Sequence, residues 1–186
     1  MRRISNTDAS FFYADTQRTP SVVGGLMIYD QSTAGRGKVR FKEILSWIED
    51  RLHLWGPFTQ RLVRVPFDLD LPYLAEDPNF DVEFHVRHLS LPKPGDWRQL
   101  CILASRIYSR PLDMNRPLWE VNVIEGLDRV EGLPKGSFAV LVKLHHMVVD
   151  GMGTVSLLQA LHSDTKVATP PRAPVREAAS VKPLPG

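Results

Sequence analysis

Hydrophobic residues recur along the chain at two different spacings, which together predict a mixture of helices and strands. Three stretches repeat apolar residues every three or four positions, as on one stripe of an amphipathic helix. They are 41–52, a segment that starts after an Asp96 N-cap and ends before Arg110-Pro111, and a segment from about 153 to 161. A shorter helix is expected at 7–14, where Ser5 or Asn6 is a suitable N-cap and the aromatic residues are expected to pack inward.

Four other segments are rich in strand formers or alternate between apolar and polar residues. They are 22–29, 82–87, 118–124 and 138–144. Gly24 and Gly25 within the first of them indicate a bulge or a close approach of two backbones. The last two are separated by a polar, glycine-containing loop and are expected to pair antiparallel. The order of elements predicts an α/β fold with a mixed sheet flanked by helices.

The chain length and composition favour one globular domain followed by a linker. The 186 residues are 43% hydrophobic and 24% charged, which is ordinary for a domain with a buried core. Residues 166–186 contain five prolines with small and charged residues, a composition typical of a linker. We therefore expect a folded domain at 1–165 and a Pro-rich linker at 166–186 that leads to a further C-terminal subdomain.

Charge and cysteine content narrow the possible partners and compartments. The 23 basic and 21 acidic residues are dispersed along the chain, without the basic stripe that a nucleic-acid partner requires. Cys101 is the single cysteine, and it is expected to be a buried structural thiol in the apolar half of its helix. No apolar run approaches the length of a membrane span or a signal peptide. These features predict a cytoplasmic protein whose contact with any membrane is peripheral.

The most informative segment for chemistry is His145-His146-Met147-Val148-Val149-Asp150-Gly151, between the last strand and the last helix. Side chains alternate between the two faces of a strand, so His145 and His146 are expected to point in opposite directions. One histidine can then face a reaction chamber while the other is held in the scaffold. Histidine can remove and return a proton near neutral pH, which suits the activation of a hydroxyl group. The Asp150 carboxylate is in a position to hold an imidazole or the loop.

Other chemistry is less well supported by the sequence. There is no Gly-x-Ser-x-Gly turn, so a covalent acyl-enzyme is not favoured. Neighbouring histidines rarely bind one metal ion because their rings diverge, and no cysteine or glutamate nearby completes a zinc site. No metal is expected. The remaining histidines lack such a context and are expected to be surface or structural residues: His53, His85, His88 and His162.

With these residues, the chain resembles the N-terminal half of the bacterial wax ester synthase/diacylglycerol acyltransferase family. The resemblance rests on the His-His-Met-Val-Val-Asp-Gly segment together with Arg116-Pro117-Leu118-Trp119-Glu120-Val121, which is similar to the family's Pro-Leu-Trp motif. It implies a chloramphenicol-acetyltransferase-like fold of two similar α/β halves with a reaction channel between them. It also implies transfer of a long-chain acyl group from acyl-CoA, as a substrate and without a cofactor, to diacylglycerol or a long-chain alcohol.

The same resemblance assigns unequal roles to the motif residues. His146 is implied to be the general base, with His145, Asp150 and Gly151 as its supports. Pro117, Leu118 and Trp119 are implied to shape the substrate channel, although the last two also begin a predicted strand and suit a buried core. The family's C-terminal half supplies the opposite channel wall, so the 186 residues alone are expected to show little turnover.

Two further functions remain open from the residues themselves. One is a condensation-type domain, which acts on carrier-protein thioesters and uses a similar His-His motif. The other is a non-catalytic binding domain that keeps the motif for packing. If the substrates are lipids, a peripheral lipid surface is a further expected partner.

Overall fold

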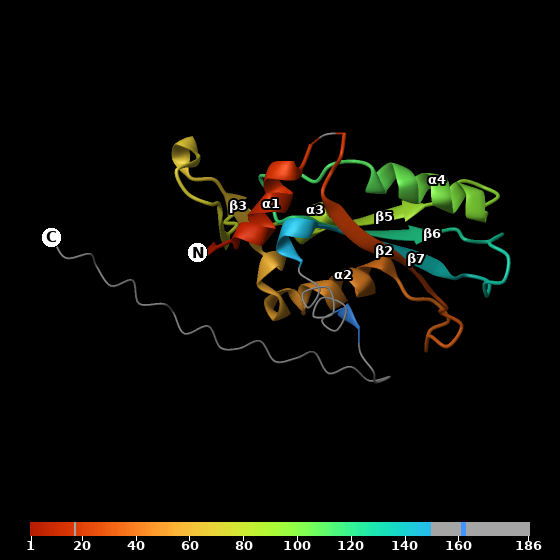
Figure 1. The fold of residues 1–186 in the computed structure, drawn as a ribbon. Helices are drawn as coiled ribbons and strands as arrows, with labels where there is room; N and C mark the ends of the chain where they lie inside the picture. Colours follow the sequence, from red (N-terminus) through yellow and green to blue (C-terminus); the bar gives the residue numbers. More distant parts are fainter. Residues whose placement is uncertain (17, 150–160, 163–186) are drawn as a thin grey trace.

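A four-stranded mixed sheet with helices on both faces forms the centre of the protein (Figure 1). The computed structural model describes residues 1–16, 18–149 and 161–162. The sheet has the order β2-β7-β6-β5, and a smaller three-stranded sheet has the order β1-β4-β3. This arrangement confirms the predicted α/β class with a mixed sheet and flanking helices. The segments expected to be a helix at about 153–161 and a linker at 166–186 lie outside the described residues, apart from Leu161.

The helices and strands follow one another along the chain with the bounds β1 Arg2–Arg3, α1 Asn6–Ala14, β2 Val22–Tyr29, α2 Phe41–Glu49, β3 Gln60–Val63, β4 Tyr73–Glu76, α3 Val82–His85, β5 Val86–Ser90, α4 Trp97–Tyr108, β6 Trp119–Glu125 and β7 Phe138–His145. A 3₁₀ turn, His146–Val148, follows β7 directly. β7 pairs antiparallel with both β2 and β6, whereas β5 pairs parallel with β6. The antiparallel β6–β7 pair was predicted from the sequence.

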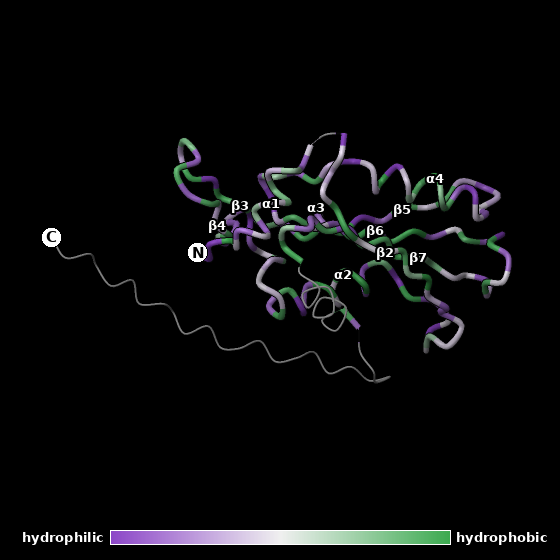
Figure 2. The backbone as a smooth tube through the Cα atoms, in the orientation of Figure 1, coloured by the Kyte–Doolittle hydropathy of each residue, from purple (hydrophilic) through white to green (hydrophobic). Residues whose placement is uncertain are grey.

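The central strand β7 is buried along its whole length because both of its faces are covered. Alternate side chains, such as Val140 and Val142, pack with the partly buried residues of α2, and the others, such as Ala139 and Leu141, pack with α4. Figure 2 shows the hydrophobic residues concentrated along the central strands, with hydrophilic residues in the connecting loops. A strand buried on both faces is a rigid support for whatever follows it in the sequence.

Helix boundaries follow the capping residues that the sequence offers. The Asp96 side chain accepts a hydrogen bond from the Gln99 backbone N–H at 2.9 Å, and the Gln99 side chain accepts one from the Asp96 N–H at 3.3 Å. This capping box starts α4 at the predicted position. The hydroxyl of Ser5 accepts from the Asp8 N–H and starts α1. The expected helix 41–52 ends earlier, at Glu49, and is followed by short 3₁₀ turns.

The strand expected at 82–87 is wrong for its first four residues. Residues Val82–His85 form one helical turn, and the strand runs from Val86 to Ser90. The cause is Asp81, whose side chain accepts a hydrogen bond from the Glu83 N–H and caps the turn. The helical turn places Val82 and His85, three residues apart, in the interior. The alternation of apolar residues in this stretch therefore does not reflect a pleated strand.

The burial expected for Cys101 is also wrong, because its side chain is exposed. The inward stripe of α4 contains Leu100, Leu103, Ala104 and Ile107 at three- and four-residue spacing, and Cys101 lies beside this stripe. Trp97 and Ile102, two large apolar residues of the same helix, are 43% and 40% exposed. In α1, Phe11 and Phe12 are half-buried but Tyr13 is exposed. Within the described residues, no helix has the length and apolar character needed to span a membrane.

Candidate active site

The two histidines of the motif lie where β7 ends, beside helix α1 and the first residues of β2. The His145 backbone N–H donates to the Leu118 carbonyl at 3.0 Å, and the His146 N–H donates to the Ser21 carbonyl at 2.8 Å. The chain therefore leaves the sheet with both residues tied to neighbouring segments. The turn His146–Val148 then packs against α1.

His145 is fully buried and has a defined environment. Its Nδ1 accepts a hydrogen bond from the Met147 N–H at 3.1 Å, so the ring proton belongs on Nε2. Nε2 faces the Asp15 carboxylate at 3.7 Å, longer than a hydrogen bond. Burial lowers the pKa of His145 below its usual value, and the negative charge of Asp15 only partly opposes this effect. His145 is therefore a neutral, fixed ring at neutral pH.

His146 has a different environment from His145. It is half-buried, and its ring stacks on Phe11 of α1 with centroids 3.8 Å apart and an interplanar angle of 22°. Its Nδ1 is enclosed without a hydrogen-bond partner among the described residues. Stacking fixes the plane of the ring while leaving its nitrogens uncommitted. Proton transfer by His146 stays a prediction.

Asp15 joins the two histidines to the rest of the site, and the sequence analysis missed it. Its Oδ1 accepts a hydrogen bond from the Ser21 N–H at 2.5 Å, and the same atom faces His145. The Ser21 carbonyl in turn accepts from His146. The Asp15 carboxylate thus positions Ser21, which holds the His146 backbone. It also lies against the His145 ring. An aspartate just after a short helix carries no sequence signal for this role.

Asp150 and Gly151, the other predicted supports, lie outside the described residues. Pro117, Leu118 and Trp119 are all buried. The Trp119 indole N–H donates to the Phe58 carbonyl at 2.9 Å, and its ring stacks on His85 at 4.6 Å. These contacts make the segment part of the core that supports β6 and, through Leu118, the His145 backbone. A role in shaping a substrate channel stays a prediction.

The other histidines have structural surroundings. His85 is buried and its Nδ1 bonds to the Trp119 carbonyl at 2.8 Å, while burial lowers its pKa. His88 stacks on Phe41 and lies 3.4 Å from Glu125. His162 bonds to the Tyr29 hydroxyl, and His53 is half-buried after α2. In the part of the chain that the structure describes, no three His, Cys, Asp or Glu side chains are grouped as a metal site would need.

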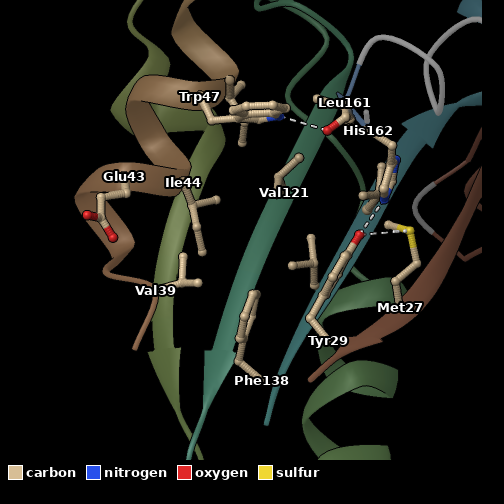
Figure 3. A pocket seen from close by; sticks show the side chains of 13 residues that line it. Met27, Tyr29, Val39, Glu43, Ile44, Trp47, Val121, Phe138, Leu161 and His162 are labelled. Atoms are coloured by element: carbon tan, nitrogen blue, oxygen red, sulfur yellow. Dashed lines mark hydrogen bonds between the residues drawn. The ribbon is translucent and has the colours of Figure 1, made fainter. Parts of the chain in front are cut away.

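An apolar cavity of about 270 Å³ lies on the α2 face of the sheet (Figure 3). Side chains from β2, β6, β7 and α2 form its walls, and Leu161 and His162 form a further part. The cavity and the two histidines share strand β7, whose residues Phe138, Val140 and Val142 line the cavity before the strand reaches His145. Strand β7 therefore carries part of the cavity wall and, at its end, the two histidines.

Comparison with known proteins places this arrangement in a family. Residues 4–184 match the model of the wax ester synthase/diacylglycerol acyltransferase catalytic domain. A putative diacylglycerol O-acyltransferase of Mycobacterium tuberculosis is 36% identical over 174 residues, which is 94% of this chain and 35% of that protein. The chain thus spans about a third of that relative's length.

Solved structures show the same fold. The wax ester synthase/diacylglycerol acyltransferase from Marinobacter aquaeolei VT8 superposes with a TM-score of 0.66 at 31% identity, over 84% of this chain and 37% of that one. The first condensation domain of the calcium-dependent antibiotic synthetase superposes with a TM-score of 0.65 at 14% identity, over 86% and 36%. The second likeness shows the fold alone, which is the chloramphenicol-acetyltransferase-like fold. The chain belongs to the wax ester synthase/diacylglycerol acyltransferase family.

Proposed function

We propose that this chain carries the general base of an acyl-CoA-dependent O-acyltransferase that delivers a long-chain acyl group to diacylglycerol or to a long-chain alcohol. The observation that carries the proposal is the His146 ring, which stacks on Phe11 at 3.8 Å next to a second, fully buried histidine. Family membership supports the choice of acyl-CoA as donor and of a lipid hydroxyl as acceptor. Acyl-CoA is a substrate in this proposal, and no cofactor is needed.

In the proposed reaction, His146 removes the proton from the acceptor hydroxyl as the oxygen attacks the thioester carbonyl. A C–O bond forms, the C–S bond breaks, and the CoA thiolate leaves and recovers the proton from the imidazolium. Because Nδ1 is enclosed, we assign the transfer to Nε2. The low pKa of His145, caused by its burial, supports this scheme. A neutral neighbour does not add a second positive charge beside His146 when that ring takes up the proton.

The remaining site residues are proposed to support this base. His145 anchors the end of β7, Asp150 and Gly151 hold the loop beyond it, and Pro117, Leu118 and Trp119 shape the substrate channel from within the core. Residues 1–165 form the acyltransferase subdomain in this proposal, and 166–186 link it to a C-terminal half that supplies the opposite channel wall. We therefore expect little turnover from the 186 residues alone.

The direct test is His146→Ala in a protein that carries both halves. Acyl transfer from radiolabelled hexadecanoyl-CoA to hexadecanol or diacylglycerol is measured, and kcat should decrease by roughly 10²- to 10⁴-fold, the usual contribution of a general base. His88→Ala is the matched control, because His88 lies on β5 against Glu125 and Phe41 and should leave the rate unchanged. Turnover like that of the unsubstituted protein would exclude His146 as the base.

The choice of donor separates this function from the two alternatives. A condensation-type domain would use a carrier-protein thioester and not acyl-CoA, so the two donors are compared in the same assay. A non-catalytic binding domain would show no turnover with either donor even when both halves are present. We also propose peripheral contact with a lipid surface, since the acceptors are poorly soluble lipids. Flotation with liposomes tests it, and failure to float with any lipid composition would contradict it.

A further inference from the structure

The β3–β4 loop, residues 64–72, exposes two large apolar side chains at its tip. Phe67 is 94% exposed and Leu69 is 81% exposed. Figure 1 shows this loop, drawn in yellow, projecting beyond β3 at the end of the molecule that carries α1. Neither side chain belongs to a hydrophobic core cluster of the described residues. Both therefore contribute nothing to the packing of the fold described above.

The backbone at the tip of the loop has an unusual conformation. Phe67 has φ 60° and ψ 16°, and Asp68 has φ 51°. These angles lie in the left-handed region, which a bulky residue rarely adopts. The turn is closed by its own backbone, because the Asp68 N–H donates to the Val65 carbonyl at 3.0 Å. Glycine would fit position 67 without strain, so stability does not explain the phenylalanine.

The charged groups of the loop are paired. The Arg64 guanidinium donates to both carboxylate oxygens of Asp68, at 3.0 and 2.8 Å. The Asp70 carboxylate accepts hydrogen bonds from the Arg3 guanidinium and from the Tyr73 hydroxyl. Each acidic side chain of the loop thus has an arginine partner. The tip can therefore approach an anionic membrane surface without an unpaired negative charge that the surface would repel.

The apolar area at the tip favours lipid over a protein as its partner. A large apolar side chain such as phenylalanine buries about 150–250 Å². Two such side chains provide much less than the area of about 800 Å² that each partner buries in a stable protein interface. Insertion into a lipid surface needs no complementary shape, because the acyl chains adapt to the side chains that enter.

The loop also lies close to the elements that hold His146. The Arg64 guanidinium carbon is 5.6 Å from the centroid of the Phe12 ring on α1. The preceding residue of that helix, Phe11, stacks on His146. A membrane that meets the tip of the loop therefore lies on the side of the molecule that carries α1 and the histidines (Figure 1).

Starting from the acyl transfer to a lipid hydroxyl proposed above, we propose that Phe67 and Leu69 insert into a lipid surface and dock the protein on it. The left-handed turn holds Phe67 outward before it meets the membrane. The Arg64–Asp68 and Arg3–Asp70 pairs lie at the level of the headgroups. Docking through this loop brings the His146 site to the surface that contains the acceptor.

The test is flotation of the protein that carries both halves with vesicles of phosphatidylcholine and phosphatidylglycerol. Phe67→Ser and Leu69→Ser should each lower the partition coefficient about tenfold or more, because each removes a large apolar side chain from the membrane. Ile102→Ser is the control. Ile102 is 40% exposed but lies on α4, away from the loop in Figure 1, so this variant should float like the unsubstituted protein.

Phe67→Gly separates lipid contact from folding. Glycine adopts a positive φ without strain, so the urea midpoint of this variant should stay the same or rise. Its partition coefficient should still decrease about tenfold or more. Acyl transfer to diacylglycerol in vesicles should decrease in the same variant, whereas transfer to a short-chain alcohol in solution should be unchanged. A loop that served only stability would not give this pattern.

Any of four results would overturn the proposal. They are absence of vesicle binding by the unsubstituted protein, unchanged binding in folded Phe67→Ser and Leu69→Ser, an equal loss in Ile102→Ser, and binding by the 186-residue chain alone. The last result would show that the C-terminal half covers the loop. Each can occur while His146→Ala still abolishes acyl transfer, so this inference and the proposed function can fail separately.

Discussion

Replacing Asp15 by alanine should destabilise the protein far more than its position at the end of a nine-residue helix suggests. The carboxylate is 14% exposed and accepts a hydrogen bond from the Ser21 N–H at 2.5 Å. Hydrogen bonds to charged groups contribute about 1.5–3 kcal/mol, and most of that is lost when a partly buried donor is left without a partner. The added attraction to His145 is small, because that ring is neutral. We therefore expect Asp15→Ala to lower the free energy of unfolding by about 1.5–3 kcal/mol.

The measurement is urea-induced unfolding followed by tryptophan fluorescence at about pH 7.5. Asp30→Ala is the matched control, because Asp30 also accepts from a backbone N–H, that of Ser32 at 2.8 Å, but does so in an exposed turn. The control should change the free energy of unfolding by less than about 0.5 kcal/mol. If the two variants lose equal stability, the idea that Asp15 joins α1 to the motif is wrong.

Asp15→Asn refines the same prediction by separating charge from shape. The amide keeps an oxygen that can accept from Ser21, so about half of the loss should be recovered. In a protein that carries both halves, Asp15→Ala should also reduce kcat, because Ser21 positions the His146 backbone. A stable, fully active Asp15→Ala protein would show that the histidines are held by other contacts.

Three more outcomes follow from the structure. Gly24→Ala places a Cβ against the Val142 carbonyl oxygen and should lower the free energy of unfolding in urea by about 1–3 kcal/mol, whereas Gly25→Ala should be nearly neutral; equal effects would contradict the close approach at Gly24. Cys101 is exposed, so Ellman's reagent should modify it in the native chain; modification only in denaturant would show that it is buried. Burial lowers the pKa values of His85 and His145, so the unfolded chain takes up protons below about pH 6.5 that the folded chain does not. The free energy of unfolding should therefore be fully maintained above that pH and decrease as the pH falls below it. Each of the two histidines contributes a decrease of up to about 1.4 kcal/mol per pH unit. The slope measured for His85→Phe should be shallower, because only His145 then contributes.

Much of the framework could be predicted from local sequence alone. The caps at Ser5 and Asp96 and the strand formers at 22–29 and 138–144 specify elements through contacts within a few residues, and these elements were predicted with bounds close to those observed. The two short strands β3 and β4 were missed. They have four residues each, too few for a period to be evident, and they are stabilised mainly by pairing with each other.

The sequence by itself determined the family, through its two motifs, and the strand that ends in His145, through its run of strand formers, because both are local properties of the chain. Only the tertiary structure decided which groups surround the two histidines. Phe11 of α1 and Asp15, which follows α1, are more than a hundred residues away in the chain, and no local pattern predicts their contacts with the histidines. The same holds for the exposed Cys101 and for the cavity beside Val140. The side of a helix that becomes buried, and the space left between a helix and a sheet, depend on how separate elements pack.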